Sequence, residues 1–132
     1  MNAPQGTSAA VRPGTKPRGA VRLFKAFANT WNGLVGCWRE EEAFRQECLL
    51  ALFVVPGGLW FGNSGIERVL LIGPMLVILI VELLNSAIET AIDRIGTERN
   101  ALSGLAKDLG SAAVFVSFVL LALTWALVLL GH

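Results

Sequence analysis

Three long runs of apolar residues alternate with short polar segments along the chain, and they predict three membrane-spanning helices. A helix perpendicular to the membrane needs about 20 residues to cross a hydrocarbon core about 30 Å thick. The second and third runs reach this length, whereas the first is broken by a Pro-Gly-Gly sequence at residues 56–58. Its span can be completed by residues 45–47, whose long side chains can snorkel. The predicted spans are about 46–62, 67–93 and 108–131.

The segment before the first run has a different pattern. Apolar and aromatic residues recur at spacings of three and four from Val21 to Trp38, with basic and amide side chains on the other positions of the wheel. This pattern predicts an amphipathic helix lying in the membrane interface, with its rings at headgroup level. A helix packed on a soluble core is the alternative. Residues 39–47 predict a charged helical segment in which Glu40 and Glu42 are solvated.

The amino-terminal residues do not fit either pattern. Residues 1–19 are rich in Gly, Pro, Ser, Thr and basic residues and lack an apolar centre, so they predict a disordered tail without a signal peptide. Residues 20–132 then form one membrane domain. The predicted fold class is an all-α membrane protein with an amphipathic surface helix and three transmembrane helices.

Polar side chains interrupt the second apolar run at helical spacing. Glu82, Asn85, Glu89 and Asp93 fall on one narrow stripe of a helix. A carboxyl group in the middle of a bilayer costs about 2.5 to 3.5 kcal/mol on insertion scales, so such groups normally face protein or a water-filled cavity. Two carboxyl groups on one buried face therefore indicate a functional site.

The totals agree with a membrane protein and argue against other classes. Hydrophobic residues make up 54% of the chain and charged residues 16%, which is outside the usual soluble range. The 11 basic and 10 acidic residues nearly cancel, so the charge does not indicate nucleic-acid binding. Cys37 and Cys48 lack metal-ligand spacing and the only histidine is His132, which argues against zinc sites and Cys-His catalysis.

The placement of the basic residues predicts the orientation in the membrane. Seven of the 11 precede the first span, three lie between the second and third spans, and Arg68 alone lies in the other loop. The positive-inside rule then places the amino terminus in the cytoplasm and the carboxyl terminus outside. The polar hairpin at residues 81–111 therefore faces the cytoplasm, where ATP is found.

This hairpin offers groups for phosphate binding. We expect the third spanning helix to begin near Ala106, which places Lys107, Asp108 and Ser111 in its first turns. The N–H groups at a helix amino terminus, together with a lysine, can hold phosphate oxygens. The alternative is that Lys107 and Asp108 only cap the helix at the interface.

The two deeper carboxyl groups suit different tasks. Glu89, near the cytoplasmic boundary, can ligate Mg²⁺, which favours few carboxylates completed by phosphate and water. Glu82 suits either a general base acting on an alcohol or a proton-relay group. No Walker A, kinase glycine loop or GxSxG sequence occurs. The residues alone leave a lipid kinase, a proton-coupled transporter component and a structural membrane subunit open.

Four segments resemble the small integral-membrane diacylglycerol kinases of bacteria. The resemblance covers about residues 20–131, and the signature E-x-x-N-x-A-I-E-x-x-x-D followed by A-K-D-x-x-S-A-A is highly specific. The segments are VRLFKA (21–26), EAFRQE (42–47), VELLNSAIETAIDRIG (81–96) and LSGLAKDLGSAAV (102–114).

The resemblance implies an assembly and a reaction. It implies a homotrimer in the inner membrane, with active sites shared between neighbouring subunits and with Mg²⁺ as cofactor. The implied reaction transfers a phosphoryl group from ATP to the primary hydroxyl of diacylglycerol, giving phosphatidate for lipid recycling. Undecaprenol phosphorylation is the alternative within the family, and a proton-coupled transporter subunit is the alternative outside it.

Motif positions imply roles for individual residues. Glu82 matches the catalytic base, Glu41 and Glu89 match the magnesium carboxylates, and Asn85 matches a residue that positions substrate or water. The implied nucleotide contacts are Arg22, Glu98, Lys107 and Asp108, and the implied lipid path comprises Lys25, Trp31, Arg45, Ser111 and Trp125, with Arg22 and Glu82 also touching substrate. Asn29, Arg99 and Asn100 depart from the family pattern, which leaves nucleotide-contact roles open at these positions.

Overall fold

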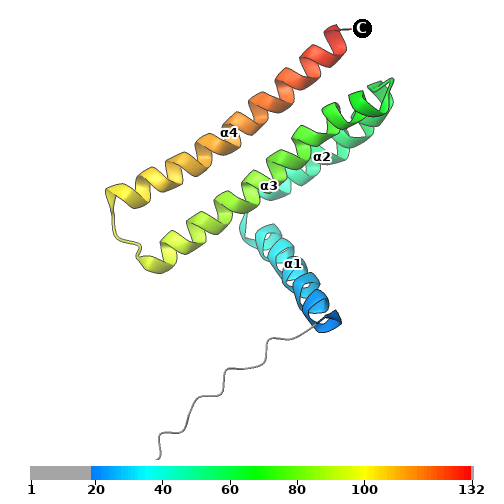
Figure 1. Cartoon of the computed structure of the whole chain (residues 1–132). Coiled ribbons are helices and arrows are strands. Elements are labelled where there is room, and N and C mark those ends of the chain that lie inside the picture. The colour runs from blue at the N-terminus through cyan, green and yellow to red at the C-terminus, as the bar shows by residue number, and fades with distance from the viewer. Residues whose placement is uncertain (1–18, 132) are drawn as a thin grey trace, which may run out of the picture. The chain divides into compact units, whose positions relative to one another are not determined.

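The computed structural model describes residues 19–131, and this range forms four α-helices (Figure 1). The predicted tail at residues 1–19 lies outside the described residues except for Gly19. The all-helical class predicted from the sequence is confirmed. The helices are α1 (Ala20–Glu40), α2 (Glu42–Phe61), α3 (Gly65–Ile95) and α4 (Ala101–Leu130).

The chain divides into two compact units, Met1–Gly33 and Leu34–His132, so that α1 begins in the first unit and ends in the second. The predicted amphipathic helix is present and extends to Glu40. None of its residues is buried, and Phe24, Phe27 and Trp31 are 75%, 71% and 63% exposed. These rings are therefore free to enter a membrane interface.

The charged segment at residues 39–47 is not one helix, contrary to the prediction. Glu41 has extended backbone angles (φ −107°, ψ 112°) and separates α1 from α2. The Arg45 Nη1 donates hydrogen bonds to the carbonyl oxygens of Trp38 and Arg39 at 2.9 and 3.2 Å. Because these carbonyls lie in the last turn of α1, Arg45 satisfies acceptors that a helix end leaves open. Glu40 and Glu42 are exposed, as predicted.

The turn predicted between the first two spans is confirmed at residues 62–65. The Ser64 side chain caps α3 by accepting a hydrogen bond from the Glu67 N–H, and Glu67 Oε2 accepts from the Asn63 N–H at 2.8 Å. A Cβ at Gly62 would lie 2.9 Å from the carbonyl oxygen of Gly58 and would also collide with Arg68. The close turn therefore requires glycine at this position.

Helix α3 is the central helix of the second unit, because both α2 and α4 pack against it. Leu71, Met75 and Ile78 are fully buried on α3. The Trp125 Nε1 of α4 donates a hydrogen bond to the Leu71 carbonyl oxygen at 2.9 Å, and its ring meets Phe61 of α2 edge-on with centroids 6.2 Å apart. These contacts join the three helices at the end of α3 that is remote from its polar stripe.

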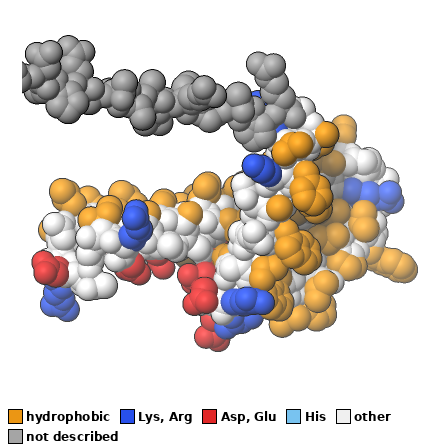
Figure 2. Space-filling model, turned by 90° about the horizontal axis from the view of Figure 1, so that it is seen from below, with side chains coloured by type: hydrophobic (Ala, Val, Ile, Leu, Met, Phe, Trp, Pro, Cys, Tyr) orange, Lys and Arg blue, Asp and Glu red, His pale blue; other side chains and the backbone are white. Residues whose placement is uncertain are grey.

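Helices α3 and α4 are long and apolar enough to cross a membrane. The predicted spans at 67–93 and 108–131 correspond to them, whereas α2 carries Glu42, Arg45 and Glu47 in its first two turns and Pro56 in its interior. The span at 46–62 therefore stays a prediction. Figure 2 shows apolar side chains spread widely over the surface in view, while the acidic side chains lie along its lower edge.

Candidate active site

The polar stripe predicted on α3 is present and runs from a buried to an exposed end. Glu82 and Ser86 are 4% and 8% exposed, Asn85 and Glu89 are half-buried, and Asp93 is exposed. A continuous helix places these residues on successive turns of one face. The stripe therefore connects the interior of the helix packing to the polar loop before α4.

Asn85 orients the Glu89 carboxylate. The Asn85 Nδ2 donates a hydrogen bond to Glu89 Oε1 at 3.2 Å, from one helical turn away. The Asn85 Oδ1 is buried and has no hydrogen-bond partner among the described residues. The carboxylate therefore fixes the Nδ2 side of the amide, while the Oδ1 side is buried against Gly110 of α4.

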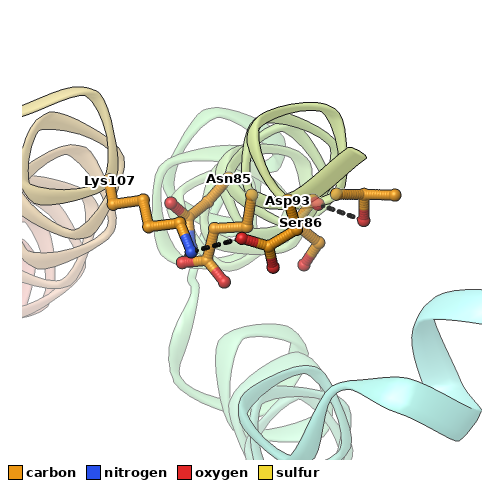
Figure 3. Close-up of polar contacts among 6 residues, drawn as sticks. Asn85, Ser86, Asp93 and Lys107 are labelled. Carbon is orange, nitrogen blue, oxygen red and sulfur yellow. Dashed lines mark hydrogen bonds and ion pairs between the residues drawn. The ribbon is translucent and has the colours of Figure 1, made fainter. Parts of the chain in front are cut away.

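Lys107 reaches from α4 to the exposed end of the stripe. Its Nζ lies 2.7 Å from Asp93 Oδ1, as the dashed line in Figure 3 shows. The hydrogen bond to Asp93 raises the pKa of Lys107 above its ordinary value. Both side chains are solvent-accessible, so the pair contributes little stability and mainly sets the direction of the ammonium group.

A pocket of about 430 Å³ surrounds the loop between α3 and α4. Glu98 and Lys107, both predicted nucleotide contacts, line it together. The other polar residues that line it are Asp93, Thr97, Arg99, Asn100 and Ser103.

The start of α4 differs from the prediction. The helix begins at Ala101 and not near Ala106, because Asn100 Oδ1 accepts hydrogen bonds from the N–H groups of Leu102 and Ser103 at 2.9 and 3.3 Å. Lys107 therefore lies in the second turn. The first turn of the helix borders the loop pocket, and Asn100, whose role the sequence left open, is the cap.

Glu41 lies at the break between α1 and α2, and its side chain makes no capping hydrogen bond. Glu41 and Glu89 both act electrostatically on Glu82. The two carboxylates predicted to bind magnesium therefore lie within electrostatic reach of the predicted base.

Residues 28–129 match the model of the prokaryotic diacylglycerol kinase family. The chain belongs to this family. It is 46% identical over 114 residues to the diacylglycerol kinase of Escherichia coli K12, covering 86% of this chain and 93% of the relative. It is 45% identical over 113 residues to that of Pseudomonas aeruginosa (86% and 92%) and 43% identical over 110 residues to that of Haemophilus influenzae (83% and 93%). The predicted family and enzyme class are confirmed.

Glu47 of this diacylglycerol kinase was not singled out from the sequence, although its carboxyl group is buried. Glu47 of α2 is 4% exposed, its Oε2 has no hydrogen-bond partner among the described residues, and it interacts electrostatically with Glu82. The available signal is its spacing of three from Phe44, which is also buried. Residues 39–47 are so rich in charge that this spacing was not distinctive.

The cysteines lie near the same polar face. The Cys37 Sγ donates to Ser86 Oγ at 3.7 Å, and burial raises the pKa of the Cys37 thiol. A raised pKa disfavours the reactive thiolate. Cys37 therefore serves to pack the end of α1 against α3.

The acidic groups fit Mg²⁺ if a nucleotide supplies the other ligands. Among the described residues, no group of three or more His, Cys, Asp or Glu could hold a metal. Glu41 and Glu89 nevertheless approach one carboxyl group from two elements, and neither makes an ion pair with a described basic residue. Mg²⁺ is typically held by one or two carboxylates together with substrate phosphates and water, which matches this donor set.

The other predicted site residues are distributed over both units. Arg22, Lys25 and Trp31 belong to the first unit, where they are exposed on α1. Arg45 caps α1, and Trp125 bonds to Leu71, which lies 11 residues before Glu82 along α3. Asp108 and Ser111 are exposed on α4, and Asn29 and Arg99 are also exposed.

Proposed function

We propose that this chain phosphorylates the primary hydroxyl of diacylglycerol with ATP, as a homotrimer in the inner membrane. The observation that carries the proposal is the buried Glu82 carboxyl, which is 4% exposed on a helix long and apolar enough to cross a membrane. A carboxyl at this depth needs a function. The family membership supplies the reaction.

The topology follows from the distribution of basic residues. Helix α2 forms the remaining span, at residues 46–62, the amino terminus is cytoplasmic and the carboxyl terminus is periplasmic. The loop pocket with Glu98 and Lys107 then opens to cytosolic ATP. The interfacial α1 carries Arg22, a further nucleotide contact.

The chemistry requires alignment and charge neutralisation more than covalent catalysis. Lys107 and Asp108 orient the nucleotide from the second turn of α4. Glu41 and Glu89 would hold Mg²⁺, which when bound neutralises phosphate charge. Asn85 keeps Glu89 in position through its hydrogen bond.

Glu82 acts as the general base. It takes the proton from the primary hydroxyl as the hydroxyl oxygen bonds to the γ-phosphorus, and the bond from that phosphorus to the bridging oxygen of ADP breaks. ADP leaves with the electron pair, and phosphatidate is released into the membrane. The lipid path is lined by Lys25, Trp31, Arg45, Ser111 and Trp125.

A homotrimer accounts for the distribution of these residues. Trp125 lies near Leu71, about 16 Å from Glu82 along α3 at 1.5 Å per residue, so one chain does not gather the whole lipid path at the base. Helix α4 also leaves Phe115, Leu123 and Leu127 exposed, at 68%, 54% and 64%. Neighbouring copies can cover this face and complete the site.

The test is label transfer from ATP in mixed micelles that offer diacylglycerol and undecaprenol in competition. We expect labelled phosphatidate, with turnover falling about 10²- to 10⁴-fold in Glu82→Gln while the oligomer persists. Glu42→Gln, which changes an exposed carboxylate, is the matched control and should retain activity. Labelled undecaprenol alone would change the substrate, and ion flux without labelled lipid would replace the kinase with a transporter.

A further inference from the structure

Asn85 lies against α4 at a position where the helix has no side chain. A Cβ at Gly110 would collide with Asn85 Oδ1 and would lie 3.1 Å from Asn85 Cγ and 3.7 Å from Asn85 Cβ. Gly110 is buried. The Asn85 amide therefore occupies the space that any other residue at position 110 would fill.

Nothing polar on α4 fixes this amide. Asn85 lines a groove of about 400 Å³ between α3 and α4, and it is the one polar side chain among the described residues around that groove. Its Oδ1 has no hydrogen-bond partner, and its Nδ2 bonds only to Glu89 among the described residues. The shape of the α4 surface at Gly110 thus decides where the amide can lie.

We propose that Gly110 is a positioning residue, which holds Asn85 in the rotamer that presents Nδ2 to Glu89. This inference rests on the proposed function, because it gives the Asn85–Glu89 hydrogen bond its purpose in orienting a metal-binding carboxylate. Groups that orient a metal ligand typically change metal affinity or activity about 10- to 100-fold when removed.

We expect Gly110→Ala to change the site while leaving the fold intact. The colliding atom is the end of a flexible side chain, so Asn85 can rotate away and the helices can stay packed. In rotating, it loses its bond to Glu89. A Cβ added at Gly73 of α3 would have open space around it, with no atom within 4 Å, and Gly73 lies outside the proposed site. Gly73→Ala is therefore the matched control.

The experiment measures Mn²⁺ affinity by electron paramagnetic resonance, using the purified full chain in micelles with a non-hydrolysable ATP analogue. We expect Gly110→Ala to bind Mn²⁺ about tenfold or more weakly than wild type, and Gly73→Ala to bind normally. The side-chain amide resonance of Asn85, assigned by its loss in Asn85→Ala, should shift in Gly110→Ala only. Unchanged Mn²⁺ affinity or an unchanged Asn85 resonance in folded Gly110→Ala would overturn the proposal.

A double variant covers the case in which Gly110→Ala does not fold. Asn85→Ala removes the colliding atoms, so Gly110→Ala in that background should fold and should bind Mn²⁺ as Asn85→Ala alone does. A double variant that also fails to fold would show that Gly110 serves another contact, which overturns the proposal. Wild-type chain that labels no lipid would instead reject the proposed function, whatever the result for Gly110.

Discussion

Helices α3 and α4 have nearly the same length and both are apolar enough to cross a membrane, yet they are used differently. In the most apolar 18-residue stretch of each helix, 39% is buried inside the protein in α3, whereas only 11% is buried in α4. The buried residues of α3 include Leu71, Met75 and Ile78 together with Glu82 and Ser86, whereas those of α4 are Gly110 and Ser117.

The difference shows how a membrane helix can carry ionisable groups. Helix α3 lies between two neighbours, so Glu82 and Ser86 face protein, and the cost of exposing the Glu82 carboxyl group to lipid is avoided. Helix α4 contributes two residues to the same region. Gly110 leaves space for the Asn85 side chain, and Lys107 forms an ion pair with Asp93. Its large apolar side chains are left for lipid or for other copies.

After Glu82, the largest expected effect in this comparison comes from Glu89 of α3. Replacing it with alanine should weaken metal-dependent ATP use about 10- to 100-fold or more, because a metal-binding carboxylate is lost from the stripe. The measurement is turnover against Mg²⁺ concentration. Thr90→Ala alters the adjacent residue, whose hydroxyl bonds only to the Ser86 carbonyl oxygen among the described residues, and should leave the titration unchanged. An unaltered titration in Glu89→Ala would remove this residue from the site.

A smaller effect should separate the apolar faces of the two helices. Met75 of α3 is fully buried, so Met75→Ala should cost about 2 kcal/mol or more of unfolding free energy through the cavity that it leaves. Leu127 of α4 is 64% exposed, and Leu127→Ala should cost less than about 0.5 kcal/mol. Reversible unfolding in mixed micelles measures both. Equal costs would mean that another copy covers α4 as fully as the chain covers α3.

The smallest effect concerns the ion pair that joins the two helices. Since the hydrogen bond to Asp93 raises the pKa of Lys107, the lysine keeps its charge to higher pH than an ordinary lysine. The pair therefore stabilises the fold below the pKa of unfolded lysine, and this contribution disappears as pH rises through the raised pKa. Asp93→Asn should change activity little at neutral pH but move the alkaline fall in kcat/KM for ATP to lower pH. If the alkaline fall in kcat/KM for ATP does not move in Asp93→Asn, Lys107 does not take part in nucleotide binding.

The sequence by itself determined the elements and the family. Apolar runs and three-and-four spacing predict helices because they depend on residues close together in the chain, and the stripe from Glu82 to Asp93 needs only the pitch of one helix. The signature around the same stripe was specific enough to identify the family. Where local signals competed, the prediction was less accurate, as at residues 39–47, where charge favoured a continuous helix and the structure has a break at Glu41.

Only the tertiary structure decided which side chains meet. Three contacts depend on the packing of different helices. Arg45 of α2 bonds to carbonyl oxygens at the end of α1, Glu47 of α2 is buried within the electrostatic reach of Glu82, and Asn85 of α3 lies over Gly110 of α4. The Trp125 bond to Leu71 joins residues 54 positions apart. Periodicity gives the face on which a residue lies but not the neighbour that the face meets, because helix packing is set by the shapes of both surfaces.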